Sequence, residues 1–179
     1  MRYDKGYLIA NRIKKRIEGC HEPEQICSSL GIDLLISDLG NLKGMYHIIK
    51  RHRFIILNSR LIDYDDLMQT LFHEIGHDQI PEHRKIAKSG IPLKDDALFN
   101  TKNRTERQAN VIAAHILLDD DEVVDFLKDG NTLERAAQEF HVHEDLLILK
   151  LEEMKKKMGK EFPFDLARLP RSADPCFLR

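Results

Sequence analysis

The residues with the clearest chemistry form an H-E-x-x-H pattern, in which His73 and His77 stand four positions apart and Glu74 follows the first histidine. Side chains four apart lie on one face of a helix, about one turn apart, so both imidazoles can reach a single metal ion. Glu74 lies roughly 60° around the helix from His77, where it can act on a water molecule without binding the metal. The pattern therefore predicts a zinc site that hydrolyses peptide bonds, with Glu74 as the general base.

Two histidines leave a catalytic zinc site one protein ligand short, because such sites use three. Glu106 is the first candidate for the third ligand. It opens a predicted helix in which Ala109 and Ala113 share its face. Small side chains allow two helices to pack closely, so this edge can face the helix that carries the histidines. An ordinary role for Glu106, as an acidic residue in the first turn of a helix, remains open from the residues alone.

His83 is the second candidate for the third ligand. It stands at the third-histidine position of the longer pattern H-E-x-x-H-x-x-G-x-x-H, but Ile80 occupies the place of the glycine that turns the chain there. Isoleucine resists the positive φ that glycine permits. Asp78, although adjacent to His77, points about 100° away from it on the helix and is a weaker candidate still.

The elements that must position these residues follow from hydrophobic periodicity and from helix caps. The helix with the histidines is predicted over residues 63–79, capped by Asp63 or Asp65, with its apolar residues on the side away from His73 and His77. Further helices are predicted at 3–18, after Pro23, at 102–118, at 120–128, from Asn131 to about 140 and at 143–158, and Asn131 with Glu134 forms a capping box at the start of the fifth of these. Strands are predicted at 32–36, 44–50 and 53–58. A loop is predicted at 80–100 and an irregular tail at 159–179. This order predicts a helix-rich α+β fold, with a small β-sheet near the N-terminus.

The composition predicts one globular domain with room for a small additional module, since the chain has 179 residues. Lys and Arg total 28 against 30 Asp and Glu, a net charge of -2, and this balance disfavours a general nucleic-acid binder. No apolar run approaches the roughly 20 residues that a membrane span needs. The charged N-terminus lacks the apolar region of a secretory signal, and the three cysteines form no C-x-x-C pair. We therefore expect a cytoplasmic protein without disulfides or membrane contact.

Two motifs taken together resemble a known family. The first is His73-Glu74-Ile75-Gly76-His77, and the second, 29 residues after His77, is Glu106-x-x-Ala109-Asn110-x-x-Ala113-Ala114-x-x-Leu117-Leu118. This pair resembles the ImmA/IrrE family of zinc metallopeptidases. The resemblance implies that zinc is held by two histidines and Glu106, with Glu74 as the general base. Family members cleave helix-turn-helix repressors, often encoded beside them in prophages, integrative elements or stress-response operons, and the resemblance implies the same class of protein substrate here.

The chain departs from the family pattern after the second motif. Members often continue with an apolar residue and proline, where this chain has Asp119-Asp120-Asp121. Members also tend to carry a helix-turn-helix-like module after the peptidase core, so the predicted division is a core at 1–120, a module at 121–158 and a tail at 159–179. Residues 131–158 contain six acidic and five basic side chains, and this balance gives little affinity for phosphates. The module is therefore expected to contact protein rather than DNA.

Two alternative functions follow from the same features. The chain could be a DNA-binding regulator with a structural metal site, or an inactive partner that sequesters a repressor. The balance of acidic and basic residues in the module argues against the DNA-binding regulator. Glu74 argues against the inactive partner, because a structural site has no use for a general base. The donor that stabilises the developing oxyanion stays open among five residues, His47, His52, Tyr64, His83 and His115.

Overall fold

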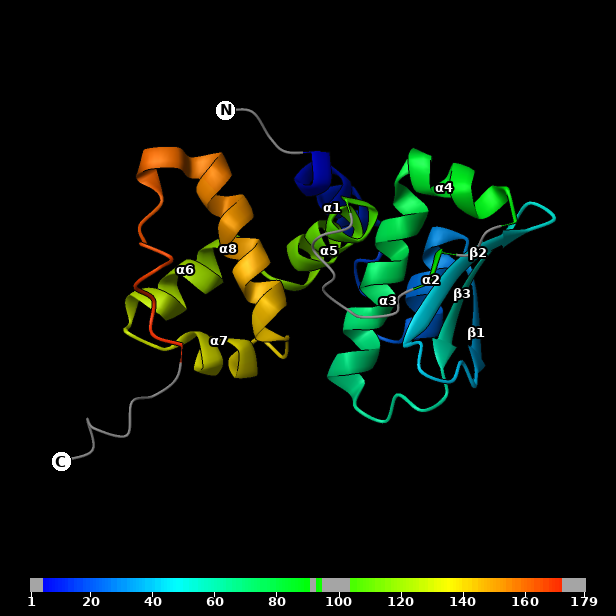
Figure 1. Cartoon of the computed structure of the whole chain (residues 1–179), viewed down its shortest axis with the longest axis horizontal. Helices are drawn as coiled ribbons and strands as arrows, with labels where there is room; N and C mark the ends of the chain where they lie inside the picture. The colour runs from blue at the N-terminus through cyan, green and yellow to red at the C-terminus, as the bar shows by residue number, and fades with distance from the viewer. Residues whose placement is uncertain (1–4, 91–92, 95–103, 172–179) are drawn as a thin grey trace.

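The computed structural model describes residues 5–90, 93–94 and 104–171 (Figure 1). The elements in chain order are α1 (Lys5–Arg16), α2 (Pro23–Leu30), β1 (Asp33–Ser37), β2 (Gly44–Ile49), β3 (His52–Asn58), α3 (Tyr64–Gln79), α4 (Pro81–Lys88), β4 (Leu93–Lys94), α5 (Arg104–Leu117), α6 (Asp120–Lys128), α7 (Leu133–Glu139), α8 (Glu144–Met158) and the short 3-10 helix η1 (Gly159–Glu161). The predicted α+β class, rich in helix and with a small sheet near the N-terminus, is confirmed.

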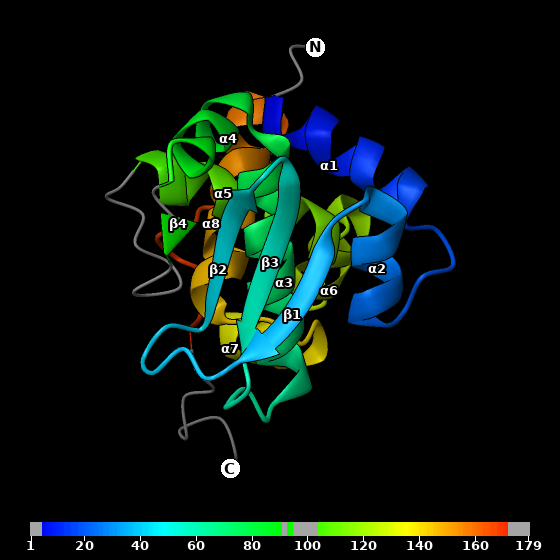
Figure 2. The same ribbon diagram turned by 90° about the vertical axis from the view of Figure 1, so that its right-hand side faces the viewer.

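The sheet has the strand order β1-β3-β2-β4, with β1 parallel to β3 and the other neighbours antiparallel. The predicted hairpin is present as β2 and β3. Its turn is made by Lys50 and Arg51, whose φ angles are 47° and 72°, so two residues without glycine or asparagine adopt the left-handed backbone of a tight hairpin. One face of the sheet packs on α3, and Figure 2 shows the opposite face toward the viewer.

Helix α3 is the central element, and it confirms the helix predicted at 63–79. Asp63 caps it by accepting a hydrogen bond from the backbone N–H of Asp66. Every residue from Gln69 to Asp78 is buried, because the sheet covers one side of the helix and α5 another. The helix therefore presents its histidines to a neighbouring helix inside the protein.

The loop predicted at 80–100 is wrong over its first part, because residues 81–88 form α4 and residues 93–94 form β4. Ile80 ends α3 in an extended conformation, with φ -98° and ψ 116°, and Pro81 begins the next helix directly. Proline fits the first position of a helix, where its missing N–H costs no hydrogen bond, but it disrupts the interior. It therefore marks a boundary between two helices here. Residues 91–92 and 95–100 of the predicted loop lie outside the described residues.

The C-terminal helices α6, α7 and α8 surround a second hydrophobic cluster, which reaches α5 through Val111 and Ala114. Figure 1 shows them on the side of α5 away from the sheet. The aspartates that depart from the family pattern have local roles. Asp119 caps α6 by accepting from two backbone N–H groups, and Asp120 binds the buried Lys150 with atoms 2.5 Å apart. Thr132, rather than the predicted Asn131, caps α7.

The described part of the tail is irregular apart from η1, and four apolar side chains of it pack against the second cluster. Two hydrogen bonds from α7 to the carbonyls of Pro170 and Arg171 hold it in place. The division at residue 120 stays a prediction. Within the described ranges, no helix is long and apolar enough to cross a membrane.

Candidate metal centre

Three side chains bring possible metal ligands together between α3 and α5. The Nε2 atoms of His73 and His77 lie 3.0 Å apart, and Oε2 of Glu106 lies 3.1 Å from the first and 3.3 Å from the second. His73 and His77 are almost completely buried and Glu106 is 8% exposed. Two imidazoles and a carboxylate are a donor set that catalytic zinc uses. Of the described residues, this is the group of three whose ligand atoms are close enough to hold one metal ion.

A close approach of two helices puts Glu106 within reach of the histidines. Gly76 lies against Ala109 of α5, and a methyl group at position 76 would stand 2.7 Å from the carbonyl oxygen of Ala109. Glu106 lies three residues before Ala109, on the same face of α5. Small side chains therefore bring the two helices together, and Gly76 within the H-E-x-x-H motif makes a close contact of its own with Ala109.

Each histidine of the pair uses its second nitrogen in a hydrogen bond. Nδ1 of His73 lies 2.7 Å from Oδ1 of Asn110, and Nδ1 of His77 lies 3.0 Å from Nδ1 of His83. An amide oxygen only accepts hydrogen bonds, so His73 carries its proton on Nδ1 and keeps a lone pair on Nε2. That is the tautomer that binds a metal through Nε2. His83 thus lies beside the group, on the Nδ1 side of His77 rather than among the converging ligand atoms.

Asp78 is a structural anchor for α4. Its fully buried carboxylate accepts hydrogen bonds from Tyr46 and Arg53 of the sheet and from Arg84 of α4. The guanidinium of Arg84 also donates to the backbone carbonyl of Asp78. These contacts fix the start of α4 against α3 and the sheet, and so they fix the position of His83.

The protonation states of the group suit a metal. Burial lowers the pKa of His77 to about 4, so its imidazole is neutral at neutral pH. Burial raises the pKa of Glu106, but in the metal-free group hydrogen bonds from the Nε2 side of His73 and His77 outweigh that effect and bring the pKa down to about 2. Burial also lowers the pKa of His83. Neutral imidazole and ionised carboxylate are the forms that coordinate metal ions, so His77 and Glu106 have the charges that a metal site needs at pH 7.

The carboxylate of Glu74 is fully buried beside β2. A methyl group at position 44 would stand 2.9 Å from its Oε1 atom and 2.7 Å from Cγ2 of Thr70. Glycine at the first position of β2 therefore leaves the space in which this carboxylate lies. The role of Gly44 cannot be predicted from the sequence, because the contact depends on how the sheet packs against α3.

The five candidates for an oxyanion donor are mostly placed elsewhere. His47 follows Tyr46 in β2, and adjacent residues of a strand point to opposite faces of the sheet. Since Tyr46 points toward Asp78, His47 lies on the other face. His52 pairs with Asp33 at the sheet edge. Tyr64 donates a hydrogen bond to the backbone carbonyl of His21, and His115 contacts Lys150. His83 contacts His77 and Gln108. His83 is thus the candidate that borders the metal group.

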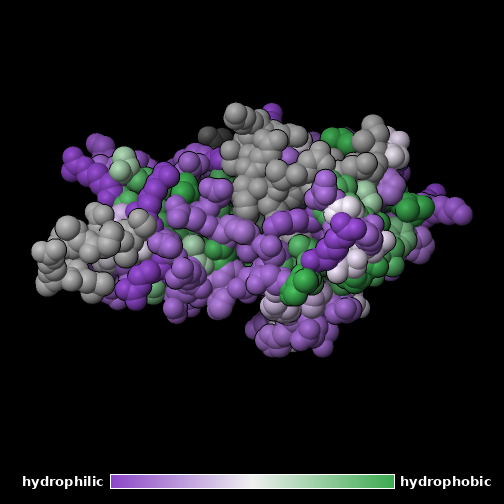
Figure 3. Space-filling view, turned by 60° about the horizontal axis from the view of Figure 1, so that its bottom comes forward, coloured by the Kyte–Doolittle hydropathy of each residue, from purple (hydrophilic) through white to green (hydrophobic). Residues whose placement is uncertain are grey.

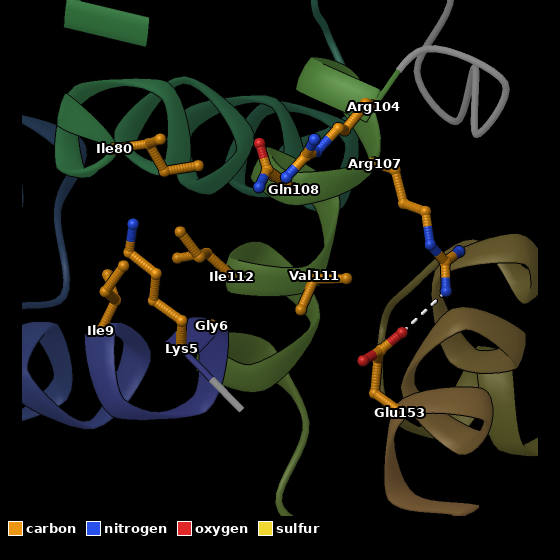
Figure 4. A pocket seen from close by; sticks show the side chains of 10 residues that line it. All are labelled: Lys5, Gly6, Ile9, Ile80, Arg104, Arg107, Gln108, Val111, Ile112 and Glu153. Carbon is orange, nitrogen blue, oxygen red and sulfur yellow. Dashed lines mark hydrogen bonds and ion pairs between the residues drawn. The ribbon is translucent and has the colours of Figure 1, made fainter. Parts of the chain in front are cut away.

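A pocket of about 250 Å³ is lined by residues of α1, α5 and α8 together with Ile80 (Figure 4). Gln108 stands in its wall, and its Oε1 atom lies 3.3 Å from Nε2 of His83. Ile80 and Ile112 form apolar parts of the wall, while Arg107 reaches across to Glu153 of α8, 2.7 Å away. One turn of α5 therefore contacts both the surroundings of His77 and the C-terminal helices.

The sequence model of Peptidase_M78, the IrrE N-terminal-like domain, matches residues 27–152, which is more than half of the chain. The chain belongs to this family. The match runs from α2 to α8, so it includes both motifs and the helices that carry them. The resemblance inferred from the motifs is confirmed, and membership in Peptidase_M78 supports a metallopeptidase-type function. A search of curated proteins finds no match.

Proposed function

We propose that this Peptidase_M78 protein is a zinc-dependent endopeptidase, in which His73, His77 and Glu106 hold the zinc and Glu74 is the general base. The observation that carries the proposal is the convergence of three ligand atoms within 4.8 Å of one another, in a buried place between α5 and the helix that also carries Glu74. The donor set, its protonation states and the family all agree with this function.

Zinc with three protein ligands supplies Lewis-acid chemistry, because it polarises a carbonyl oxygen and lowers the pKa of water. Glu74 contributes the proton transfers: its carboxylate accepts a proton from the attacking water and passes it to the leaving amine. His73 and His77 hold their orientation through their Nδ1 atoms. Burial of the whole group strengthens each of these electrostatic interactions, because little water remains to screen them.

For the substrate we propose a helix-turn-helix transcriptional repressor of a mobile element or a stress-response operon. The support is the family resemblance of the two motifs together with a C-terminal module that suits protein contacts. A restricted substrate also fits an enzyme that acts among the cell's own proteins.

DNA binding by the module is the less favoured function. In helix-turn-helix proteins the N-terminal residues of the second helix enter the major groove. The corresponding turn of α8 carries Glu144 and Asp145, and the preceding His143 lies 2.6 Å from Asp66 of α3. Acidic side chains there repel phosphates. Figure 3, which brings this lower side of the molecule forward, shows mainly hydrophilic residues across the middle of the view.

A cleavage assay that compares the unchanged protein with the Glu74→Gln variant tests the proposed function. The purified protein is mixed with the repressor encoded nearest to its own gene, beside the Glu74→Gln variant, and the products are identified by mass spectrometry. We expect a single cut with the unchanged protein and a loss of more than about 100-fold in rate with the variant, the range of general acid–base catalysis. Cleavage that survives Glu74→Gln would contradict the mechanism.

Metal analysis tests the site independently of any substrate. We expect zinc to copurify with the protein and to be lost in His73→Ala, while Glu74→Gln keeps it. Equal zinc in the unchanged protein and in His73→Ala would contradict the ligand assignment.

A further inference from the structure

We propose that His83 is a positioning residue for His77: its Nδ1 atom accepts the Nδ1–H hydrogen bond of His77 and so holds the Nε2 atom of His77 toward the metal group. The proposal rests on the proposed zinc site, since it concerns how one ligand of that site is oriented. The supporting geometry is a chain of three side chains from α3, α4 and α5.

The direction of each hydrogen bond in this chain follows from its acceptor. His77 binds a metal through Nε2 only when its proton is on Nδ1, so His77 donates across the 3.0 Å between the two Nδ1 atoms and His83 accepts. His83 then carries its single proton on Nε2. That atom lies 3.3 Å from Oε1 of Gln108, which is an acceptor. One neutral tautomer of His83 therefore satisfies both contacts.

The position of His83 is well determined by its surroundings. The side chain is only 2% exposed, and α4 is tied to α3 through Arg84 and the buried carboxylate of Asp78. A neutral, buried and anchored imidazole is a rigid acceptor, so it restricts rotation of the His77 ring about its Cβ–Cγ bond. Rigid partners of this kind orient metal ligands and raise their basicity.

The two histidines of the motif thus have different partners. Asn110 accepts from His73, 2.7 Å away, and comes from α5 directly. His83 accepts from His77 and is itself held by α5 through Gln108. The same helix that supplies Glu106 therefore orients both imidazoles, one directly and one through His83.

Two variants at position 83 separate orientation from packing. His83→Phe keeps a ring of similar shape but removes both nitrogens, whereas His83→Asn places an amide oxygen close to the position of Nδ1. Zinc affinity is measured by competition with a chromophoric chelator, which requires no substrate. We expect a decrease of roughly 10–100-fold for His83→Phe, the usual effect of losing such a partner, and an affinity within about threefold of the unchanged protein for His83→Asn, because Asn restores the acceptor.

Ala87→Gly is the matched control, because Ala87 is fully buried on the same helix but its side chain has no polar atom. It destabilises α4 and is expected to lower the melting temperature without changing zinc affinity. An unchanged zinc affinity in His83→Phe would overturn the proposal. Equal decreases in zinc affinity in His83→Phe, His83→Asn and Ala87→Gly would also overturn it, because they would indicate a merely structural role. A protein that binds no zinc at all would instead overturn the proposed function.

The tautomer of His83 provides a second readout. Nitrogen-15 NMR of the zinc-loaded protein distinguishes protonated from unprotonated ring nitrogens. We expect His83 to carry its proton on Nε2 alone, and a proton on Nδ1 would overturn the assignment. Gln108→Met removes the acceptor of that proton at a side chain that borders a pocket, so the replacement has room. It is expected to lower zinc affinity, but less than His83→Phe does.

Discussion

Replacing Gly76 by alanine sets two physical effects against each other. Alanine has the higher helix propensity, by about 1 kcal/mol in a helix interior, so propensity alone predicts a more stable α3. The packing predicts the opposite. The new methyl carbon would stand 2.7 Å from the carbonyl oxygen of Ala109, 2.9 Å from its Cα and 3.1 Å from its carbonyl carbon. All three are backbone atoms, so no side-chain rotation relieves the contact.

The packing effect should be the larger. Overpacking a tight contact costs about 1–3 kcal/mol, and the upper end applies because a whole helix must move. Subtracting the gain of about 1 kcal/mol in propensity leaves a net loss of about 2 kcal/mol. For a chain of this size, that corresponds to a fall of about 4–8 °C in melting temperature. Metal ligands tolerate displacements of only about 0.2 Å, so moving α5 should also displace Glu106 and weaken zinc binding.

Thermal unfolding of the metal-free protein and zinc competition measure the two consequences separately. The double variant Gly76→Ala, Ala109→Gly is a control, because Ala109→Gly removes a side chain that is not part of the clash. We expect it to restore neither stability nor zinc affinity. A higher melting temperature in Gly76→Ala than in the unchanged protein would refute the reasoning, since propensity would then have outweighed the contact.

Three further predictions concern the site and its surroundings. Glu106→Gln should weaken zinc binding by more than about 100-fold in competition assays, because losing an outer partner alone costs roughly 10–100-fold. Gly44→Ala should lower peptidase activity without changing metal content, since the methyl group displaces the Glu74 carboxylate. Burial raises the pKa of Asp120, but hydrogen bonds from its lysine partners outweigh it and set the pKa at about 2, below the ordinary 3.8. Its contribution of about 2 kcal/mol is therefore complete above about pH 4 and lost as the pH falls through 2, and urea unfolding of Asp120→Asn should show a weaker pH dependence over that range.

Much of the candidate site could be predicted because its information is local. The spacing of His73 and His77 fixes a common face on any helix, and the apolar pattern of residues 63–79 identifies the helix without reference to the rest of the chain. Glu106 required a second helix at the right distance. The sequence favoured it only through the small residues on its face, and the family resemblance supplied the rest.

The partners of the ligands could not be predicted in the same way. His83 lies in α4, within a segment where proline and glycine predict irregular structure. Gln108 and Asn110 contact histidines of different elements only after α4 and α5 have packed. Nothing in the spacing of these residues indicates those contacts. Asn110 did have one signal, since it follows Glu106 by four residues and so shares its helix face.

The arrangement of α5 connects the metal group to the C-terminal helices. Glu106 contacts the two histidines of the metal group and Gln108 contacts His83. Arg107 between them binds Glu153 of α8 at 2.7 Å (Figure 4) and Glu152 at 3.2 Å. Glu153 is 8% exposed, and a partly desolvated pair of this kind holds its geometry better than a surface ion pair. These ion pairs connect α8 to the first turn of α5, next to Glu106. The first turn of α5 therefore both brings Glu106 to the metal group and ties α5 to α8.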